Sequence, residues 1–161
     1  MENYLIRKIM QEDNDNLKSI IKQVFEELNS PREGTVYSDP TTNDLFNLFS
    51  EKRSVLWVAE ENEEIFGCCG VYPTKGLDKD CAELVKFYLS SNARGKGIGK
   101  ALMQQSIQSA KDLGFKKLYL ESLPEFSKAV CMYERSGFER LDKPMGSSGH
   151  GSCNIWMIKE L

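Results

Sequence analysis

A short glycine-rich stretch carries the residue types of an anion-binding turn. It reads Arg94-Gly95-Lys96-Gly97-Ile98-Gly99, and Lys100 follows it. Glycine lets backbone N–H groups approach a ligand closely, and the start of a helix adds unpaired N–H donors at the positive end of the helix dipole. Together with the cationic side chains, these features predict a phosphate site between a strand and a helix. A turn that needs glycine only for its geometry is the alternative.

The spacing of these glycines excludes two common phosphate motifs. A P-loop ends in Gly-Lys-Ser/Thr, whereas Ala101 follows Gly99 and Lys100 here. A dinucleotide-binding turn needs Gly-x-Gly-x-x-Gly in a first βαβ unit. The last glycine comes one residue early here, and the turn follows a predicted run of antiparallel strands.

Glu83 is the carboxylate best placed for proton transfer. It stands inside an apolar run, residues 81–89, that is typical of a strand. Burial among apolar neighbours would raise its pKa toward neutrality, where a carboxylate can act as a general base. The alternative is a structural carboxylate paired with Lys86 or another cation. Strict alternation would put Glu83 and Phe87 on one face of the strand and Lys86 on the other.

Glu121 and His150 are rival candidates for the base. Glu121 lies near the end of a predicted strand, residues 115–122, and its alternative role is a solvated charge. His150 is the single histidine of the chain and lies in a glycine- and serine-rich segment, residues 147–153. An unperturbed pKa of about 6.5 suits a base or a group that orients a substrate. An exposed, flexible hairpin tip is the alternative reading of this segment.

Alternating and helical apolar patterns predict the elements that must position these residues. The expected order is β, α, α, β, β, β, α, β, α, β, β. Predicted strands cover residues 4–9, 54–60, 65–72, 81–89, 115–122, 138–141 and 154–159, and predicted helices cover 17–28, 45–49, 101–113 and 124–136. A mixed sheet with helices on both faces would bury such a pattern, and we expect one domain over residues 1–161.

The bulk composition limits the function classes. The chain has 161 residues and a net charge of −3. Nucleic-acid-binding domains usually carry a basic face, so we expect no nucleic-acid partner. The apolar runs are shorter than the roughly 18 residues of a membrane span and the N-terminus lacks a signal-peptide pattern, so we expect no membrane association. The five cysteines form no Cys-x-x-Cys pair, which predicts no metal site and a reducing, cytoplasmic location.

Two segments together resemble the Gcn5-related N-acetyltransferase (GNAT) family. Its acyl-CoA signature is Gln/Arg-x-x-Gly-x-Gly/Ala, and residues 94–99 match every fixed position. Downstream, Ala129-Val130-Cys131-Met132-Tyr133-Glu134-Arg135-Ser136-Gly137-Phe138 resembles the family's Ala-…-Tyr-Glu-…-Gly-Phe segment. The resemblance covers almost the whole chain, including the order of its elements.

The resemblance implies an α/β (α+β, three-layer) fold. Its mixed, mostly antiparallel sheet of about seven strands would have helices on both faces and a V-shaped splay between the fourth and fifth strands. Backbone N–H groups of residues 94–99 would hold the CoA pyrophosphate, with Lys100 near the phosphates. The strand end Phe87-Tyr88-Leu89 would pair with the pantetheine arm. Ser127 lies roughly where the family places an Asn or Ser against that arm, although the preceding Pro124-Glu125-Phe126 departs from the commoner Asn-containing loop.

The resemblance also implies roles in acyl transfer. Tyr133 matches the tyrosine near the thioester sulfur, where its O–H would donate to the departing thiolate. A tyrosine packed on the sheet is the alternative. Glu83 matches the strand that carries the catalytic glutamate in the histone-acetylating branch. Glu121 and His150 would border the site of the acceptor.

These features predict an acetyl-CoA-dependent N-acetyltransferase. The acceptor would be a primary amine of a small molecule or peptide, attacking directly in a ternary complex because no nucleophile–base pair is evident. A non-catalytic acyl-CoA-binding sensor on the same fold is the alternative from another class. The resemblance leaves a homodimer open, and the acceptor has no specific signal in the sequence.

Overall fold

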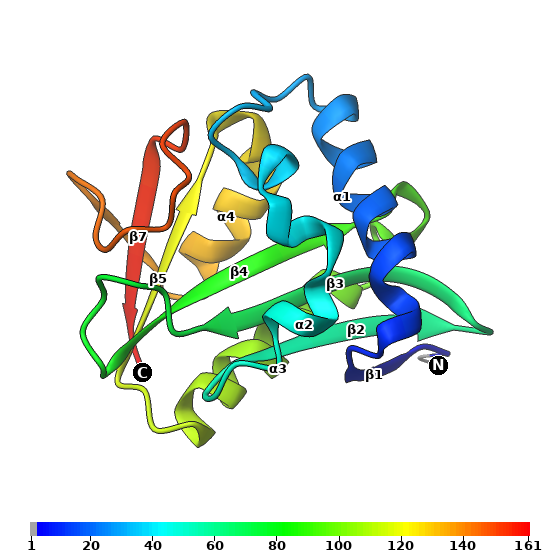
Figure 1. The fold of residues 1–161 in the computed structure, drawn as a ribbon, viewed down its shortest axis with the longest axis horizontal. Coiled ribbons are helices and arrows are strands. Elements are labelled where there is room, and N and C mark those ends of the chain that lie inside the picture. The colour runs from blue at the N-terminus through cyan, green and yellow to red at the C-terminus, as the bar shows by residue number, and fades with distance from the viewer. Residues whose placement is uncertain (1–2) are drawn as a thin grey trace.

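The computed structural model describes residues 3–161 as a seven-stranded sheet between two layers of helices (Figure 1). The strand order is β1-β2-β3-β4-β5-β7-β6. The strands are β1 Leu5–Lys8, β2 Val55–Glu61, β3 Glu64–Tyr72, β4 Cys81–Leu89, β5 Lys117–Ser122, β6 Glu139–Leu141 and β7 Ile155–Glu160, and the helices are α1 Asn14–Glu27, α2 Leu45–Leu48, α3 Ile98–Asp112 and α4 Ser127–Arg135. The predicted element order and mixed sheet are confirmed. Residues 1 and 2 of the expected domain lie outside the described residues.

One hydrophobic cluster on each face of the sheet holds the layers together. Leu102 of α3 and Tyr133 of α4 belong to the first, which we call the α3-side core. Leu17 and Phe25 of α1 belong to the second, the α1-side core. The helical spacing of apolar residues puts them on one stripe of each helix. Because fully burying such a side chain contributes roughly 1.5–3 kcal/mol, these stripes set where each helix lies on the sheet.

The sheet splits between its fourth and fifth strands. β4 and β5 pair in parallel through three registered positions, which end at Glu83 opposite Tyr119. Beyond this point β4 stays with β3, whereas β5 continues beside β7 as far as Ser122 opposite Ile155. Figure 1 shows β4 and β5 diverging from a common end. The expected V-shaped splay is therefore confirmed, and Glu83 lies at its apex.

A β-bulge in β4 overturns the predicted alternation of side chains. The register with β3 shifts between Cys68 and Gly70, and Lys86 has a left-handed backbone with φ of 56°. An extra residue moves every later side chain to the opposite face. Phe87 therefore packs on the α3-side core, and Tyr88 packs on the α1-side core. Glu83 and Phe87 do not share a face as predicted.

Gly67 of β3 makes room for this bulge. A Cβ atom at Gly67 would stand 2.3 Å from the carbonyl oxygen of Tyr88 and 2.8 Å from a methyl group of Leu89. No side chain fits at such distances, so glycine is required where β3 approaches the bulged strand. A left-handed non-glycine residue costs roughly 1–2 kcal/mol. The pairing and packing of the surrounding sheet offset this cost at Lys86.

Candidate active site

A groove runs from the open end of the splay to the start of α3. The space open to the centres of water-sized molecules in this groove is about 430 Å³. Its walls include Val24, Leu28, Phe87, Tyr88, Leu89, Ala93, Arg94, Gly95, Gly97, Ile98, Gly99, Lys100, Glu125, Phe126, Ser127, Lys128, Ala129 and Met132. Every residue predicted to bind the cofactor except Lys96 is among them. The structure therefore brings β4, the glycine-rich turn and α4 together around one space.

Two glycines of the turn leave its inner surface open. Gly95 and Gly97 both have φ of 79°, and a Cβ atom added to either would meet nothing within 4 Å. Gly97 also caps α3, whose first-turn N–H groups have no partner within the helix. The result is a concave set of backbone donors at the positive end of a helix dipole. This geometry fits a phosphate or pyrophosphate group.

Gly99 has a different role from the other two glycines. A Cβ atom there would stand 2.9 Å from a methyl group of Leu89 and 3.4 Å from the Phe87 ring. Its missing side chain lets the first turn of α3 lie directly on the end of β4. The third glycine of the predicted motif therefore serves packing, and packing sets the distance between the turn and the strand.

The cations of the turn are partly used by the fold. The Arg94 guanidinium forms a 2.8 Å ion pair with Glu27 of α1 and donates a 3.2 Å hydrogen bond to the carbonyl oxygen of Leu89. The Lys96 ammonium lies 5.1 Å from the centre of the Phe66 ring. Lys100 lines the groove. An anion in the groove would therefore meet mainly backbone N–H groups of the turn, with Lys100 beside them.

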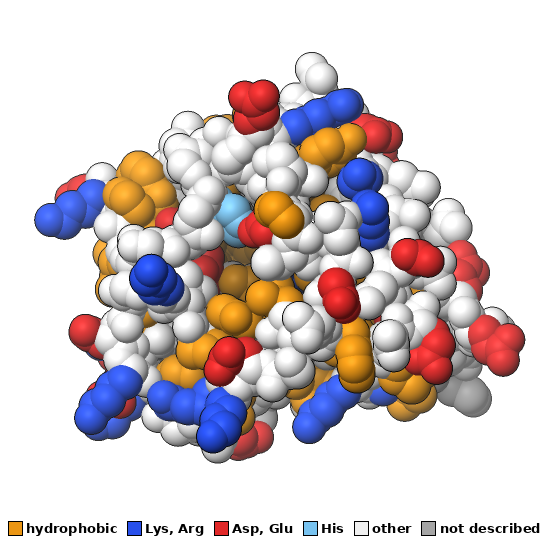
Figure 2. All heavy atoms as spheres, in the orientation of Figure 1, with side chains coloured by type: hydrophobic (Ala, Val, Ile, Leu, Met, Phe, Trp, Pro, Cys, Tyr) orange, Lys and Arg blue, Asp and Glu red, His pale blue; other side chains and the backbone are white. Residues whose placement is uncertain are grey.

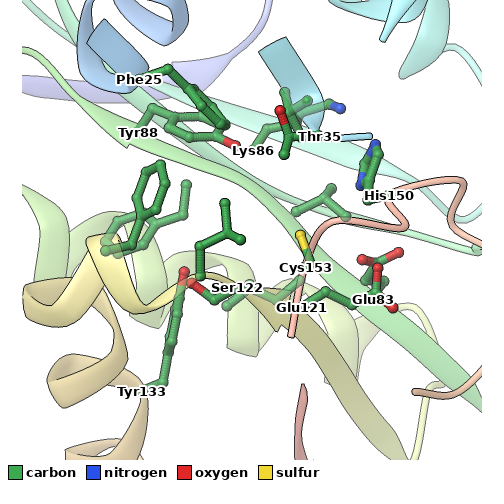
Figure 3. A pocket seen from close by; sticks show the side chains of 16 residues that line it. Phe25, Thr35, Glu83, Lys86, Tyr88, Glu121, Ser122, Tyr133, His150 and Cys153 are labelled. Atoms are coloured by element: carbon green, nitrogen blue, oxygen red, sulfur yellow. The ribbon is translucent and has the colours of Figure 1, made fainter. Parts of the chain in front are cut away.

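A second cavity lies beside the groove at the apex of the splay (Figure 3), where the face seen in Figure 2 is hollowed. Phe87, Tyr88 and Phe126 line both spaces, so they form the boundary between them. The space open to the centres of water-sized molecules in this cavity is about 60 Å³. Its other lining residues are Phe25, Thr35, Val36, Glu83, Leu84, Val85, Lys86, Glu121, Ser122, Leu123, Tyr133, His150 and Cys153. All four residues predicted for catalysis or acceptor binding, Tyr133, Glu83, Glu121 and His150, meet here.

Glu83 has the environment of a general base. Its side chain is 4% exposed, and its carboxylate accepts a 2.6 Å hydrogen bond from the Thr74 hydroxyl. Burial is the main cause that raises its pKa to about 7. Glu121 also raises this pKa, whereas the Thr74 hydrogen bond and the charge of Lys86 lower it. Among residues 3–161 the ion pair between Glu83 and Lys86, offered above as an alternative, does not form within 4.0 Å.

Tyr133 extends into the cavity from the opposite wall (Figure 3). Its ring packs between Phe87 and Phe138, with both ring centres 5.9 Å away. Burial raises the pKa of Tyr133 far above its usual value, so the phenol keeps its proton at neutral pH. A protonated hydroxyl in this position can donate a hydrogen bond but cannot act as a base.

Glu121 also lines the cavity, but the fold already uses its carboxylate. It accepts a 2.7 Å hydrogen bond from the Tyr119 hydroxyl and a second from the Ser148 hydroxyl. The Tyr119 oxygen in turn accepts a 3.0 Å bond from the Met145 N–H. These bonds tie residues 145–148 to β5. Glu121 is therefore less available to an acceptor than Glu83.

His150 closes the cavity against a distant loop. Its Nε2 atom lies 2.9 Å from the Asp39 carboxylate, and its side chain is 12% exposed. Burial alone would raise the pKa of Asp39, but hydrogen bonds from His150 and Thr41 lower it to about 2. Ser152 adds a second link by donating a 2.6 Å bond to the carbonyl oxygen of Glu33. The exposed hairpin tip considered from the sequence is thus a docked segment.

Three cavity features escaped the sequence analysis. The contact between His150 and Asp39 joins segments 111 residues apart, so no local pattern predicts it. The bond from Thr74 to Glu83 spans nine residues and depends on how the turn after β3 folds back on β4. Lys86 was considered only as an ion-pair partner. A cation in the middle of an apolar strand suggests a functional residue, but the face of β4 on which Lys86 lies depends on the bulge.

Cys153 does not offer a nucleophile to this cavity. Burial raises the pKa of its thiol to about 12, so almost none is thiolate at neutral pH. Among the described residues, no group of three or more His, Cys, Asp or Glu side chains is placed to hold a metal ion. In the same part of the chain, no helix is long and apolar enough to cross a membrane.

The splayed strands, the open glycine turn and the cavity that holds Glu83 and Tyr133 fit the architecture of an acyltransferase. The chain belongs to the acetyltransferase (GNAT) family, whose family model matches residues 21–138. The uncharacterized N-acetyltransferase YjgM of Escherichia coli (strain K12) is 33% identical over 158 residues, which cover 98% of this chain and 95% of that protein. The resemblance inferred from the two sequence segments is confirmed.

Solved structures share the fold. A GNAT-family acetyltransferase from Staphylococcus aureus Mu50 superposes with a TM-score of 0.83 at 22% identity and covers 98% of both chains. The PaiA N-acetyltransferase from Thermoplasma acidophilum, solved in complex with coenzyme A, superposes with a TM-score of 0.75 at 22% identity and covers 99% of this chain and 100% of that one. Identities this low establish the architecture only.

Proposed function

We propose that this protein transfers an acetyl group from acetyl-CoA to a primary amine by direct attack in a ternary complex. The observation that carries the proposal is the position of Glu83 and Tyr133 on opposite walls of one cavity. That cavity meets the open glycine turn through the walls at Phe87 and Tyr88. A candidate base and a candidate acid thus share one cavity, the anion cradle lies in the adjoining groove, and residues 1–161 would form one catalytic domain.

The groove has the features that acetyl-CoA requires. Backbone N–H groups of residues 94–99 would hold the pyrophosphate, with Lys100 beside it and Ser127 at the start of α4 near the pantetheine arm. The β4 backbone at Phe87-Tyr88-Leu89 would pair with the arm, because the splay separates it from β5 there. When bound, acetyl-CoA supplies the acetyl group as a thioester.

Glu83 would take the proton that the acceptor amine must lose. An alkylamine with a pKa of about 10.4 is mostly protonated at neutral pH, so it needs a base before or during attack. A carboxylate with a pKa of about 7 is half ionised at neutral pH and is a stronger base than an ordinary glutamate. Glu83 therefore has the basicity for this role. Glu121 is the less suitable candidate, because its carboxylate already accepts two hydrogen bonds.

Tyr133 would stabilise the departing sulfur. A thiolate that leaves in an apolar cavity needs a hydrogen-bond donor, and a tyrosine that keeps its proton provides one. The apolar packing against Phe87 and Phe138 holds the ring in place before the reaction. Cys153, the cavity residue that could form an acyl-enzyme, has a protonated thiol, so direct attack on the thioester is favoured.

Thiol release measured across a panel of amines tests this function. We expect CoA release that depends on both acetyl-CoA and an amine, with intersecting lines in double-reciprocal plots. Parallel lines, or an acetylated Cys153 detected by mass spectrometry, would contradict direct attack. Tight CoA binding without turnover on any amine would instead favour the non-catalytic sensor. Sedimentation of the same sample would decide whether the protein is a homodimer.

A further inference from the structure

Lys86 is a buried cation in the acceptor cavity, and the fold does not neutralise it directly. Its side chain is 6% exposed and lines the cavity beside Thr35 and His150 (Figure 3). Within the described residues, the ammonium forms no ion pair within 4.0 Å, and its nitrogen is not among the fully buried side-chain atoms that lack a partner, so it keeps some contact with the open part of the cavity. It interacts electrostatically at longer range with Asp39 and Glu83. The ammonium is thus held near acids without touching one.

The acids near Lys86 already have closer partners of their own. Each carboxylate accepts a hydrogen bond from a neighbouring side chain. Glu83 is bonded by Thr74, Glu121 by Tyr119 and Ser148, and Asp39 by His150 and Thr41. These bonds hold the three carboxylates in positions where none forms an ion pair with Lys86. In this arrangement an anionic partner for the ammonium would come from outside the chain.

The backbone shows that the position of Lys86 is built into the strand. The left-handed φ of 56° puts Lys86 on the cavity face, next to Val85, instead of on the opposite face as alternation requires. A buried ammonium without a partner is costly, and burial lowers the pKa of Lys86 accordingly. An anionic group placed beside it would favour the charged form and recover that cost.

We infer that the acceptor is an amino acid, that is, an amine with a carboxylate a few bonds away, and that Lys86 binds this carboxylate while Glu83 receives the amine. The inference rests on the proposed function. Glu83 and Lys86 lie three residues apart on β4 and line the same cavity. The amine and the carboxylate of an amino acid match the opposite charges of Glu83 and Lys86. A diamine has no negative group and would leave the Lys86 ammonium unpaired.

The other charges at the cavity favour a carboxylate over a phosphate. Three acids, Glu83, Glu121 and Asp39, lie around the cavity against the single ammonium of Lys86. A dianionic phosphate would be repelled more strongly by this surplus of negative charge than a monoanionic carboxylate. Lys86 is therefore suited to one compact negative charge.

A panel of the common α-amino acids and their α-amides tests this inference. The amide keeps the side chain and the amino group but lacks the negative charge. Its amine is also the weaker base, so a protein that recognises the amine alone would prefer the amide. We expect at least one amino acid to be acetylated with a kcat/KM on the order of 10- to 100-fold above its amide, the gain of one charge-assisted hydrogen bond. Equal or better use of the amides would overturn the inference.

The variant Lys86→Met should remove this preference. It is expected to lower kcat/KM for the amino acid to the level of its amide. The kcat/KM for the amide should stay within about threefold of the wild-type value, because the amide has no carboxylate to pair with Lys86. Lys111→Met, on the exposed face of α3, is the matched control and should keep the preference. If Lys86→Met does not fold, Lys86→Gln takes its place. A variant that loses activity equally on acid and amide would contradict the assignment.

Binding separates this inference from the proposed function. Calorimetry in the presence of saturating CoA measures amino acid and amide affinity without any turnover. If no amine is acetylated, the proposed function fails. The inference still holds if amino acids bind and Lys86→Met abolishes that binding, and it fails if acids and amides bind alike or not at all.

Discussion

The Thr74 hydroxyl donates a 2.6 Å hydrogen bond to the buried carboxylate of Glu83. This bond joins the turn after β3 to the apex of the splay, and it works against the desolvation that raises the pKa of Glu83 to about 7. A base near neutral pH is the outcome of these two opposing causes. Substitution of Glu83 or Thr74 should therefore change the pH dependence of the reaction rate.

The variant Glu83→Gln should lose the base while preserving shape. We expect kcat/KM for the amine to fall on the order of 100- to 10 000-fold, the usual contribution of a general base. The wild-type rate should rise with pH through about 7 as Glu83 ionises. The variant should lack this rising limb of the pH–rate profile. An unchanged limb would move the role of base to Glu121 or His150.

The variant Thr74→Val should shift that limb to higher pH. The hydrogen bond from Thr74 lowers the pKa of Glu83, so its removal raises the pKa further and keeps Glu83 protonated at neutral pH. Thr74→Ser, which keeps a hydroxyl, should restore the wild-type profile. A profile that scales down without shifting would show that Thr74 serves only the folding of its turn.

The variant Tyr133→Phe should slow the chemical step. Loss of one hydrogen-bond donor to a developing charge costs on the order of 100- to 1000-fold in kcat. The affinity for CoA should change little, because the ring still packs on Phe87 and Phe138. Equal turnover by Tyr133→Phe, measured as thiol release, would remove Tyr133 from the mechanism.

The variant Gly97→Glu should abolish CoA binding. The added side chain would occupy the open cradle and bring a negative charge to the phosphates. Gly149→Glu is a matched control, since Gly149 has nearly the same φ, 80° against 79°, and equally open surroundings, yet lies outside the groove. We expect calorimetry to show a loss of CoA affinity on the order of 100-fold or more for the first variant alone. Equal losses would indicate general backbone strain.

The raised pKa of Glu83 also predicts a pH-dependent stability. The folded pKa of about 7 lies above the unfolded value of 4.5, so the folded state binds more protons between these two pH values. Stability from this group is therefore full below pH 4.5 and is lost as pH rises to about 7. At about 1.4 kcal/mol per pKa unit, a difference between pKa values of 4.5 and about 7 limits the loss to about 3 to 4 kcal/mol. The melting temperature of Glu83→Gln should therefore fall less than that of the wild type when the pH is raised from 5 to 8.

The part of the groove formed by the end of β4 and the glycine-rich turn could be predicted from the sequence, whereas the contributions of Val24 and Leu28 from α1 could not. Local geometry explains the turn, because Gly95 and Gly97 adopt left-handed φ and α3 begins directly after it. Spacing along the chain is enough to predict such a site. Lys96 is the exception, because its ammonium turns to Phe66 of a different strand.

The acceptor cavity could be predicted only in part. Glu83 and Tyr133 were identified through the family resemblance, and His150 through its rarity in the chain. The face of Lys86 was predicted wrongly, because one extra residue in β4 reverses the alternation and no local pattern announces it. Glu121 was expected near the cavity and lies there, but its bonds to Tyr119 and Ser148 could not be foreseen.

The sequence by itself determined the order of elements, the anion-binding turn before α3 and the family to which the chain belongs. These properties depend on periodicity and on short contiguous motifs. The tertiary structure alone decided the pKa of Glu83, the docking of His150 on Asp39 and the direction of Lys86. Each of these depends on burial and on contacts between distant segments, and both arise only when the splayed sheet and its two loops are assembled.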